Sequence, residues 1–547
     1  MILCGEMRLL QAISGAIAAA FIVAGPALPA IDQGSQAAAW PRGSAVVSYT
    51  GERALERALA RHPATVIRRV PALHVVEVRP RGDIARYAVQ LGAEPGIVDI
   101  ERPAPRRSLV EPALLTTPTG EPFQWQYAAV HADQVSAQVE QDAAKLTIAV
   151  IDTGADLSAP DLAAKSPLAH SVLARSADVT DRNGHGTFVA ALAAGSGSNG
   201  EGVSGVAGGA QLLIVQAGGP SGSFSDVEEA TAIVYAVDHG ARIINLSLGG
   251  PSTSTTERRA IDYAVGKGVL LVAAVGNSHA DGNPVEYPAA LLQPRGSRGV
   301  GGQGLAVAAS TRSGARASFS STGTHLSLAA PGEAVFSAVS AFSPASRYPR
   351  VAVPGSGGLY GYGSGTSFAA PQVAGAAALV WAASPQLSAE EVASILEQTA
   401  SGQGTWNEEL GYGVLDVAAA VARAQDPARS TGEPLAVSSP RSVSLQKSAA
   451  RLSLTAHLPR GAASRRVQLD TRLSVAGRPG AEAARTVLLE SFDGTRWLRA
   501  AAAITDASGR AVWSYAVTPG SYRIRAHYLG TDEVAPAASA AVKLTLR

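Results

Sequence analysis

Three short segments of the chain contain an acid, a base and a hydroxyl group that together could cleave an acyl bond. Asp152 ends the apolar run LTIAVID, His185 lies between two glycines in DRNGHGTFVAALAAG, and Ser367 lies in GYGSGTSFAAPQVAGAAAL. A serine becomes a strong nucleophile when a histidine accepts its proton and an acid orients that histidine. Taken alone, each residue has a simpler interpretation as a helix cap or a packed side chain. Because all three occur at expected ends of strands or helices, the pattern favours a catalytic triad.

The segments around these residues indicate how they could be positioned. Glycines precede Ser367, an alanine-rich run follows it, and Pro371 is tolerated only near a helix start. We therefore predict a helix that begins within one turn of Ser367 and places the hydroxyl at the positive end of the helix dipole. Asn277 ends the apolar run LVAAVGN. Its amide either donates to an oxyanion beside the Ser367 N–H or forms an ordinary Asx turn.

The spacing of apolar segments divides the 547 residues into several domains. Between roughly residues 146 and 424, short apolar strands alternate with helices, which is typical of an α/β domain with a doubly wound, mostly parallel sheet. Residues 45–103 fit a small α/β unit with three strands, and residues 434–547 fit an all-β, immunoglobulin-like sandwich. The strands expected in the large domain are LTIAVID, QLLIVQA, ARIINLSL, VLLVAAVGN and GLAVAAS.

Three motifs resemble the active-site signatures of the subtilisin-like serine proteases: VIDTG, NGHGTFVA and GTSFAAPQVAG. The resemblance covers roughly residues 122–424 and implies a subtilisin-like fold. It implies that Asp152, His185 and Ser367 form the triad, with Asn277 as the side-chain donor of the oxyanion hole. In such a triad the histidine takes the serine proton during attack and returns it to the leaving amine.

The segments that flank the triad have expected roles of their own. Residues 1–30 form an apolar, small-residue signal peptide, which contains Cys4, the only cysteine of the chain. The exported protein is therefore expected to form no disulfides. Residues 31–107 resemble a pro-region that acts as a folding chaperone and intramolecular inhibitor, and residues 108–426 resemble the catalytic domain. Self-cleavage is expected after Arg107.

A strand-addition mode of substrate binding follows from the same resemblance. The SLGG segment, with Ser247, Leu248 and Gly249, resembles the strand that pairs with the substrate backbone and lines the first pocket. Gly222 and Ser223 are expected to face this strand across the bound peptide.

Specificity and metal binding are the subjects of two further resemblances. Glu286 in NPVEYPAA either lies in the specificity pocket, favouring a basic residue at the cleaved bond, or is a solvated rim residue. Asp161 and Asn199 resemble ligands of a structural calcium ion, although Asn199 also fits an ordinary turn. The chemistry itself is expected to require no cofactor. Phe188 and Gln372 stand where the family often has histidine, which puts the local packing in doubt.

The composition limits the partners of the chain. Its 45 Lys and Arg residues nearly balance 44 Asp and Glu residues, giving a formal charge of +1. This excludes a general attraction to nucleic acid or to anionic membranes. We expect a monomer without a stable membrane anchor, secreted to an extracellular or periplasmic location. Its expected partners are protein or peptide substrates and its own pro-region.

Two other classes of function share features with these motifs. GTSFA approaches the G-x-S-x-G elbow of lipases and esterases, but that fold orders its triad as Ser, acid and His, whereas the order here is Asp, His and Ser. The second alternative is a catalytically silent binding or adhesion protein with a subtilisin-like fold. Its expected signature is a missing triad residue, and none is missing here.

Overall fold

The computed structural model describes residues 43–82, 84–109, 111–112, 123–200, 202–353, 356–426, 448–457, 466–476, 486–492, 497–505, 508–516, 520–528 and 534–546. The predicted signal peptide and Cys4 lie outside these residues. The chain divides into two compact units, of which one comprises Met1–Arg102 with Ser442–Arg547 and the other Pro103–Arg441. Within the described part of the chain, no helix is both long and apolar enough to cross a membrane.

The N-terminal part of the first unit is a small α/β structure. Its antiparallel sheet has the order β2-β3-β1-β4, with β1 (Ala45–Tyr49), β2 (Ala64–Val70), β3 (Val75–Pro80) and β4 (Ile97–Glu101). The helices are α2 (Glu52–Arg61) and α3 (Ile84–Gly92). The sequence pattern predicted three strands and missed β2, an edge strand whose register shifts between Val66 and Arg68. This irregularity interrupts the two-residue alternation by which a strand is recognised.

The C-terminal part of the first unit is the expected all-β structure. One sheet contains β18 (Ala450–His457), β19 (Arg466–Val475) and β22 (Arg510–Ala516). The other contains β20 (Thr486–Phe492), β21 (Trp497–Ile504), β23 (Gly520–Tyr528), β24 (Ala537–Ala538) and β25 (Val542–Leu546). Leu452 and Leu469 from the first sheet share a buried core with Leu489 and Ile524 from the second, as in a β-sandwich.

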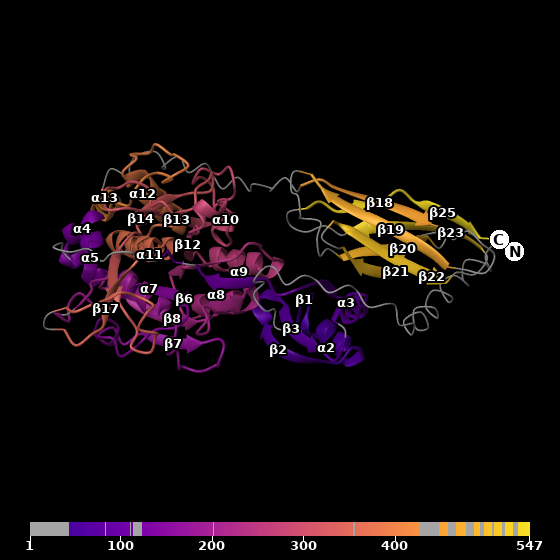
Figure 1. Ribbon diagram of the computed structural model, residues 1–547, viewed down its shortest axis with the longest axis horizontal. Helices are drawn as coiled ribbons and strands as arrows, with labels where there is room; N and C mark the ends of the chain where they lie inside the picture. The colour runs from indigo at the N-terminus through magenta and orange to yellow at the C-terminus, as the bar shows by residue number, and fades with distance from the viewer. Residues whose placement is uncertain are drawn as a thin grey trace. The chain divides into compact units, whose positions relative to one another are not determined.

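The second unit is built on a seven-stranded parallel sheet with the order β14-β13-β12-β10-β6-β8-β7 (Figure 1). Its strands are β6 (Thr147–Asp152), β7 (Leu168–Ser171), β8 (Gln211–Gln216), β10 (Ile243–Leu246), β12 (Leu270–Ala274), β13 (Gly304–Ser310) and β14 (Leu328–Pro331). Every residue of β10, β12 and β13 is buried. Because successive side chains point to opposite faces of a sheet, both faces are covered, which confirms the predicted doubly wound α/β class.

The helices of the second unit are α4 (Trp125–Ala129), α5 (Ala137–Asp142), α6 (Pro160–Ala163), α7 (His185–Ala194), α8 (Asp226–Asp238), α9 (Thr255–Gly266), α10 (Ala289–Leu292), α11 (Thr366–Ala383), α12 (Ala389–Thr399) and α13 (Val417–Gln425). Helices α7 and α11 pack together, as do α8 and α9. Small residues dominate α7 and α11, and almost every residue of both helices is buried. An alanine-rich helix allows this close approach to its neighbours on every side.

Two small three-stranded sheets complete the second unit. One pairs β15 (Val335–Ala338), β17 (Tyr360–Gly363) and β16 (Arg350–Val351). The other places β5 (Pro105–Ser108) between β11 (Leu248–Gly249) and β9 (Ser223–Ser225). The run ARIINLSL, predicted as one strand, therefore divides into β10 of the large sheet and β11 of this small sheet.

Candidate active site

Asp152 and His185 form a buried hydrogen-bonded pair at one end of the parallel sheet. Asp152 is the last residue of β6, His185 is the first residue of α7, and the Nδ1 to Oδ1 distance is 2.7 Å. Two glycines permit this approach of loop and helix. A Cβ atom at Gly186 would lie 2.1 Å from the carbonyl oxygen of Gly154, whose own φ of 109° favours glycine.

The electrostatic surroundings of His185 favour the imidazolium form. Burial lowers the pKa of His185, but the charge and hydrogen bond of Asp152 and then the charge of Glu111 raise that pKa above the usual histidine value. The carboxylate of Glu111 lies 3.4 Å from Nε2 of His185. Among the residues that the structure describes, none accepts or donates a hydrogen bond at Nε2. The ring nitrogen opposite Asp152 is thus the one that a reacting hydroxyl could use as a base.

Ser367 is the second residue of α11, which confirms that this helix begins within one turn of it. Its Oγ donates to the carbonyl oxygen of Ser247 at 3.5 Å, and the Ser247 hydroxyl donates to the carbonyl oxygen of Ser367 at 2.7 Å. The next residue, Phe368, places its ring centroid 5.8 Å from that of His185. The structure therefore brings the start of α11, the start of α7 and the end of β6 to one place.

Asn277 lies just beyond β12 and is held by the residue before Ser367. Its Oδ1 accepts hydrogen bonds from the backbone N–H of Thr366 at 2.8 Å and from the Thr366 hydroxyl at 2.9 Å. A Cβ atom at Gly365 would lie 3.3 Å from Nδ2 of Asn277 and 3.7 Å from the backbone nitrogen of Ser367. The amide nitrogen and the Ser367 N–H thus border the same space beside Gly365, as two donors of an oxyanion hole would.

The segment before the large domain occupies the surface predicted to bind substrate. Strand β5 is antiparallel to both β9 and β11, so that Arg107 pairs with Ser223 on one side and with Gly249 on the other. The Ser108 N–H donates to the carbonyl oxygen of Gly222 at 2.8 Å. The residues predicted to face each other across a peptide do so, with the chain's own segment between them.

The register of β5 shows which residue of this segment lies opposite Ser247. Ser108 pairs with Leu248, so that the next residue, Leu109, comes opposite Ser247, whose carbonyl contacts Ser367. Leu109 is 1% exposed, whereas Arg107 is exposed. This register does not favour the predicted cleavage after Arg107.

Glu286 shares the pocket that holds the Leu109 side chain. A Cβ atom at Gly249 would lie 2.7 Å from Cδ2 of Leu109 and 2.4 Å from Oε2 of Glu286. Glu286 is 5% exposed, which excludes its alternative interpretation as a solvated rim residue. Burial raises the pKa of Glu286, and the charge of Arg107 opposes that rise. A basic side chain in this pocket would therefore meet a buried carboxyl group.

Asp161 and Asn199 are brought together as the calcium prediction requires. Asp161 is fully buried, and its Oδ1 accepts hydrogen bonds from Asn199 Nδ2 at 3.0 Å and from the Val203 N–H at 3.2 Å. Burial is the main cause that raises the pKa of Asp161. The described residues contain no group of three His, Cys, Asp or Glu side chains placed for a metal. One buried carboxylate beside an amide fits calcium only with loop carbonyls as further ligands.

Phe188 and Gln372 are accommodated without a histidine. The Phe188 ring lies 4.3 Å from that of Phe368, and Gln372 Nε2 donates to the carbonyl oxygens of Pro331 at 2.6 Å and Phe368 at 2.8 Å. These contacts fix the helix that carries Ser367. Glu111 and Thr366 were not predicted from the sequence, in which the only available signal is their closeness to Ser108 and Ser367.

A buried Asp–His pair and a serine at a helix start, on a doubly wound parallel sheet and in the chain order Asp, His and Ser, form an arrangement found in serine hydrolases. Residues 143–413 match the model of Peptidase_S8, the subtilase family. The chain is 36% identical over 307 residues to subtilisin DY of Bacillus licheniformis. The aligned region covers 56% of this chain and 98% of subtilisin DY. The chain belongs to the subtilase family, whose subtilisin-like members are serine-type endopeptidases.

Two further similarities were found. The thermophilic serine proteinase of Bacillus sp. (strain AK1) is 37% identical over 262 residues, which cover 47% of this chain and 58% of that protein. The crystal structure of fervidolysin from Fervidobacterium pennivorans, a keratinolytic enzyme related to subtilisin, has a TM-score of 0.59 at 23% identity. The structural alignment covers 93% of this chain and 76% of the fervidolysin chain, and it supports the fold.

Proposed function

We propose that this chain is a secreted serine endopeptidase that is made as a self-processing precursor. The observation that carries the proposal is the 2.7 Å bond between His185 and Asp152, buried beside Ser367 at the N-terminus of α11. In the proposed reaction the Ser367 hydroxyl attacks the peptide carbonyl carbon and passes its proton to Nε2 of His185. The imidazolium, stabilised by Asp152, then protonates the leaving amine, and water hydrolyses the acyl-enzyme by the same steps.

The developing negative charge in this reaction requires fixed donors. We assign this role to the Asn277 amide and the Ser367 N–H, which border one space and lie at the positive end of the α11 dipole. The chemistry needs no cofactor. Calcium, if bound, would be held by Asp161 and Asn199, where it would stabilise the segments that contain Asn199 and Val203.

The pairing of β5 with β9 and β11 supports an inhibited precursor. A substrate that adds a strand at the same place must displace the segment that contains Arg107 and Ser108. Because Leu109 lies opposite Ser247, we propose the bond after Leu109 as the processing site, in place of the bond after Arg107. Residues 31–109 then form the inhibitory pro-region. Residues 434–547 form a separate sandwich domain, to which we assign no binding partner.

The test compares the wild type with Ser367→Ala. Ser364→Ala is the matched control, since Ser364 is also buried but accepts a hydrogen bond from the Ala334 N–H instead. We expect the wild type and the control to lose the pro-region and cleave reporter peptides, and Ser367→Ala to stay full length and inactive. N-terminal sequencing of the mature protein should begin at residue 110.

Two outcomes would contradict the proposal. A wild type that folds and is processed by an added protease, yet cleaves no peptide, would favour the catalytically silent binding protein. A Ser367→Ala variant that matures as fast as the wild type would remove Ser367 from the mechanism. Mature protein that begins at Ser108 would restore the cleavage after Arg107 and overturn the register argument alone.

A further inference from the structure

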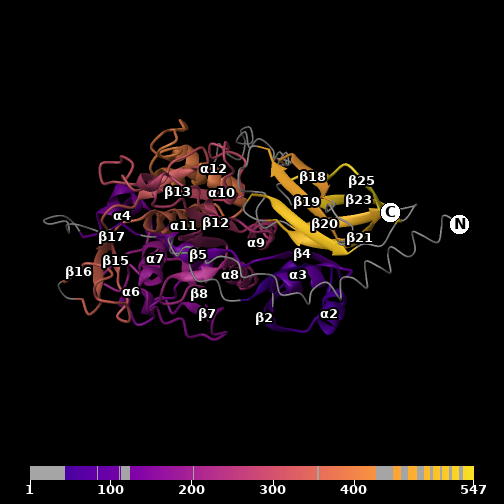
Figure 2. The ribbon, with the colours of Figure 1, turned by 45° about the vertical axis from the view of Figure 1, so that its right-hand side comes forward.

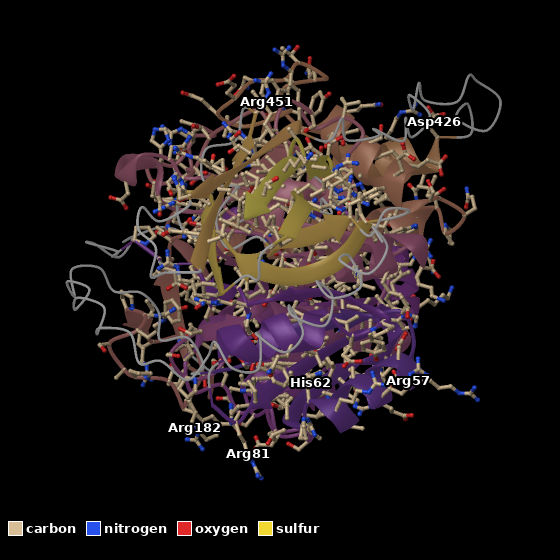
Figure 3. The ribbon with its side chains drawn as sticks, turned by 90° about the vertical axis from the view of Figure 1, so that its right-hand side faces the viewer. Arg57, His62, Arg81, Arg182, Asp426 and Arg451 are labelled. Atoms are coloured by element: carbon tan, nitrogen blue, oxygen red, sulfur yellow. The ribbon has the colours of Figure 1, made fainter. Side chains whose placement is uncertain are left out.

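Arg106 in β5 is an arginine enclosed by protein. Charged side chains are almost never fully buried unless they are paired. Most of the arginines whose side chains the structure describes are exposed. Figure 3 labels several exposed examples, including Arg57, Arg182 and Arg451. The side chain of Arg106, in contrast, has 0% exposure.

The guanidinium of Arg106 contacts carboxylates from two helices. Its Nε donates to Glu229 of α8 at 2.8 Å, and its Nη2 lies 2.6 Å from Glu257 of α9. The ribbon in Figure 2 shows β5, α8 and α9 in the same part of the second unit. Nη1 donates to the carbonyl oxygens of Pro105 and Ser252, each at 3.0 Å. The carboxylate and carbonyl acceptors of this pocket match the planar set of N–H donors of an arginine side chain.

The pocket holds more acidic side chains than one arginine can pair with. A third buried carboxylate, Asp226, accepts the backbone N–H of Ala104 at 2.8 Å. Within the described part of the chain, one oxygen each of Asp226, Glu229 and Glu257 has no hydrogen-bond partner. Burial is the main cause that raises the pKa of Glu229 to about 8 and that of Asp226 to about 6, even with Arg106 in place. The N-termini of α8 and α9 partly stabilise these acids.

The position of the pocket links it to substrate binding. Arg106 pairs with Phe224 of β9, on the strand that lies where a substrate strand would lie. At Gly250 a Cβ atom would come within 2.9 Å of Nη1 of Arg106, so the glycine makes room for the guanidinium. When the pro-region leaves, Arg106 leaves with it, and the carboxylates of the pocket lose their cation. Glu229 and Glu257 then repel each other without a cation between them, so the emptied pocket favours a new cation.

We propose that this pocket, formed by Asp226, Glu229 and Glu257, selects an arginine side chain of the substrate at the fourth residue before the cleaved bond. The inference rests on the proposed protease function and on the processing bond after Leu109, since Arg106 is the fourth residue before that bond. The main-chain pairing of β5 is independent of side chains, so a substrate can adopt the same register and present its own arginine to the pocket.

The experiment uses mature wild-type enzyme and reporter peptides that differ only at the fourth residue before the labelled bond, which carries Arg, Lys or Leu. In the first set, every peptide has Leu directly before the labelled bond. In the second set, every peptide has Arg at that position. We expect kcat/KM to be about 10- to 100-fold higher for Arg than for Leu, from hydrogen bonds to charged groups. Lys should lie between them, because a point charge cannot contact both carboxylates as a fork does.

Variants then assign the preference to the pocket. Glu257→Gln should reduce the Arg-to-Leu ratio about tenfold. Asp262→Asn is the matched control, because it removes one charge from the same helix at an exposed position where Asp262 accepts a bond from Gln303. If Glu257→Gln fails to mature, Glu229→Gln serves the same purpose. The ratio of kcat/KM for the Arg and Leu peptides in the wild type is in itself a test that requires no variant.

The failures of the two proposals are distinguishable. Mature enzyme that cleaves the Arg and Leu peptides equally well overturns the pocket proposal and leaves Arg106 as an anchor of the pro-region. A ratio that Glu257→Gln and Glu229→Gln both leave unchanged also overturns it. Mature protein that cleaves no peptide at all refutes the protease function itself.

Discussion

Thr366, the residue before the proposed nucleophile, is expected to act by positioning Asn277. Its hydroxyl donates to Asn277 Oδ1 at 2.9 Å and accepts the Gly276 N–H at 3.2 Å. Thr366 is fully buried, and its own N–H also donates to Asn277. Thr366→Val keeps the shape of the side chain and removes only the hydroxyl group.

The size of the effect follows from these contacts. The substitution removes one hydrogen bond to Asn277 and leaves the Gly276 N–H without this partner, which together should lower the free energy of unfolding by about 2–3 kcal/mol. The Thr366 N–H still holds Asn277 Oδ1, so its amide is loosened and not lost. We therefore expect kcat to fall about tenfold, compared with about 10²–10³-fold for Asn277→Leu.

The assay measures kcat and KM on a reporter peptide and the unfolding temperature of each variant. Thr366→Ser is the control, because it restores the hydroxyl and should recover most of kcat. A Thr366→Val variant with lowered unfolding temperature but unchanged kcat would refute the positioning role. A normal kcat in Asn277→Leu would remove the oxyanion donor altogether.

Three further measurements test the electrostatics of the fold and site. Burial lowers and Asp152 raises the pKa of His185, with a net rise, so kcat/KM should fall as the pH decreases through that pKa. Asp152→Asn should shift the inflection to lower pH and reduce kcat by about 10⁴-fold, and an unshifted inflection would contradict this account. Burial raises the pKa of Glu397 from 4.5 to about 8. Between about pH 4.5 and pH 8 the folded state therefore keeps a proton on Glu397 that the unfolded state loses, so the free energy of unfolding should decline over this range. Glu397→Gln should flatten the corresponding decline in the unfolding temperature. A decline as steep as that of the wild type would exclude Glu397 as its cause. If Asp161 and Asn199 hold calcium, chelation should lower the unfolding temperature of the wild type by about 5 °C and leave Asp161→Asn unaffected, whereas equal responses would place the ion elsewhere.

Local pattern was sufficient for most of the large domain. The runs before Asp152 and Asn277 are continuous apolar strands, and the alanine-rich runs after His185 and Ser367 are helices, as predicted. Strands β7 and β14 of the large sheet were not predicted. Each has four residues, without the β-branched or aromatic enrichment that identifies a strand. Their pairing with longer strands, and not their own propensity, makes them strands.

The sequence by itself determined which residues lie at the ends of strands and helices, because apolar periodicity, glycine and proline act over a few neighbouring residues. Only the tertiary structure decided which of these ends meet. Glu229 and Glu257 lie 123 and 151 residues from Arg106 along the chain, and each appears in sequence as a polar residue near the start of an ordinary helix. Their carboxylates form a pocket only because β9 and β11 hold β5 between them and bring the starts of α8 and α9 to its side. Side-chain contacts of this kind depend on the packing of distant elements, on which local patterns carry no information.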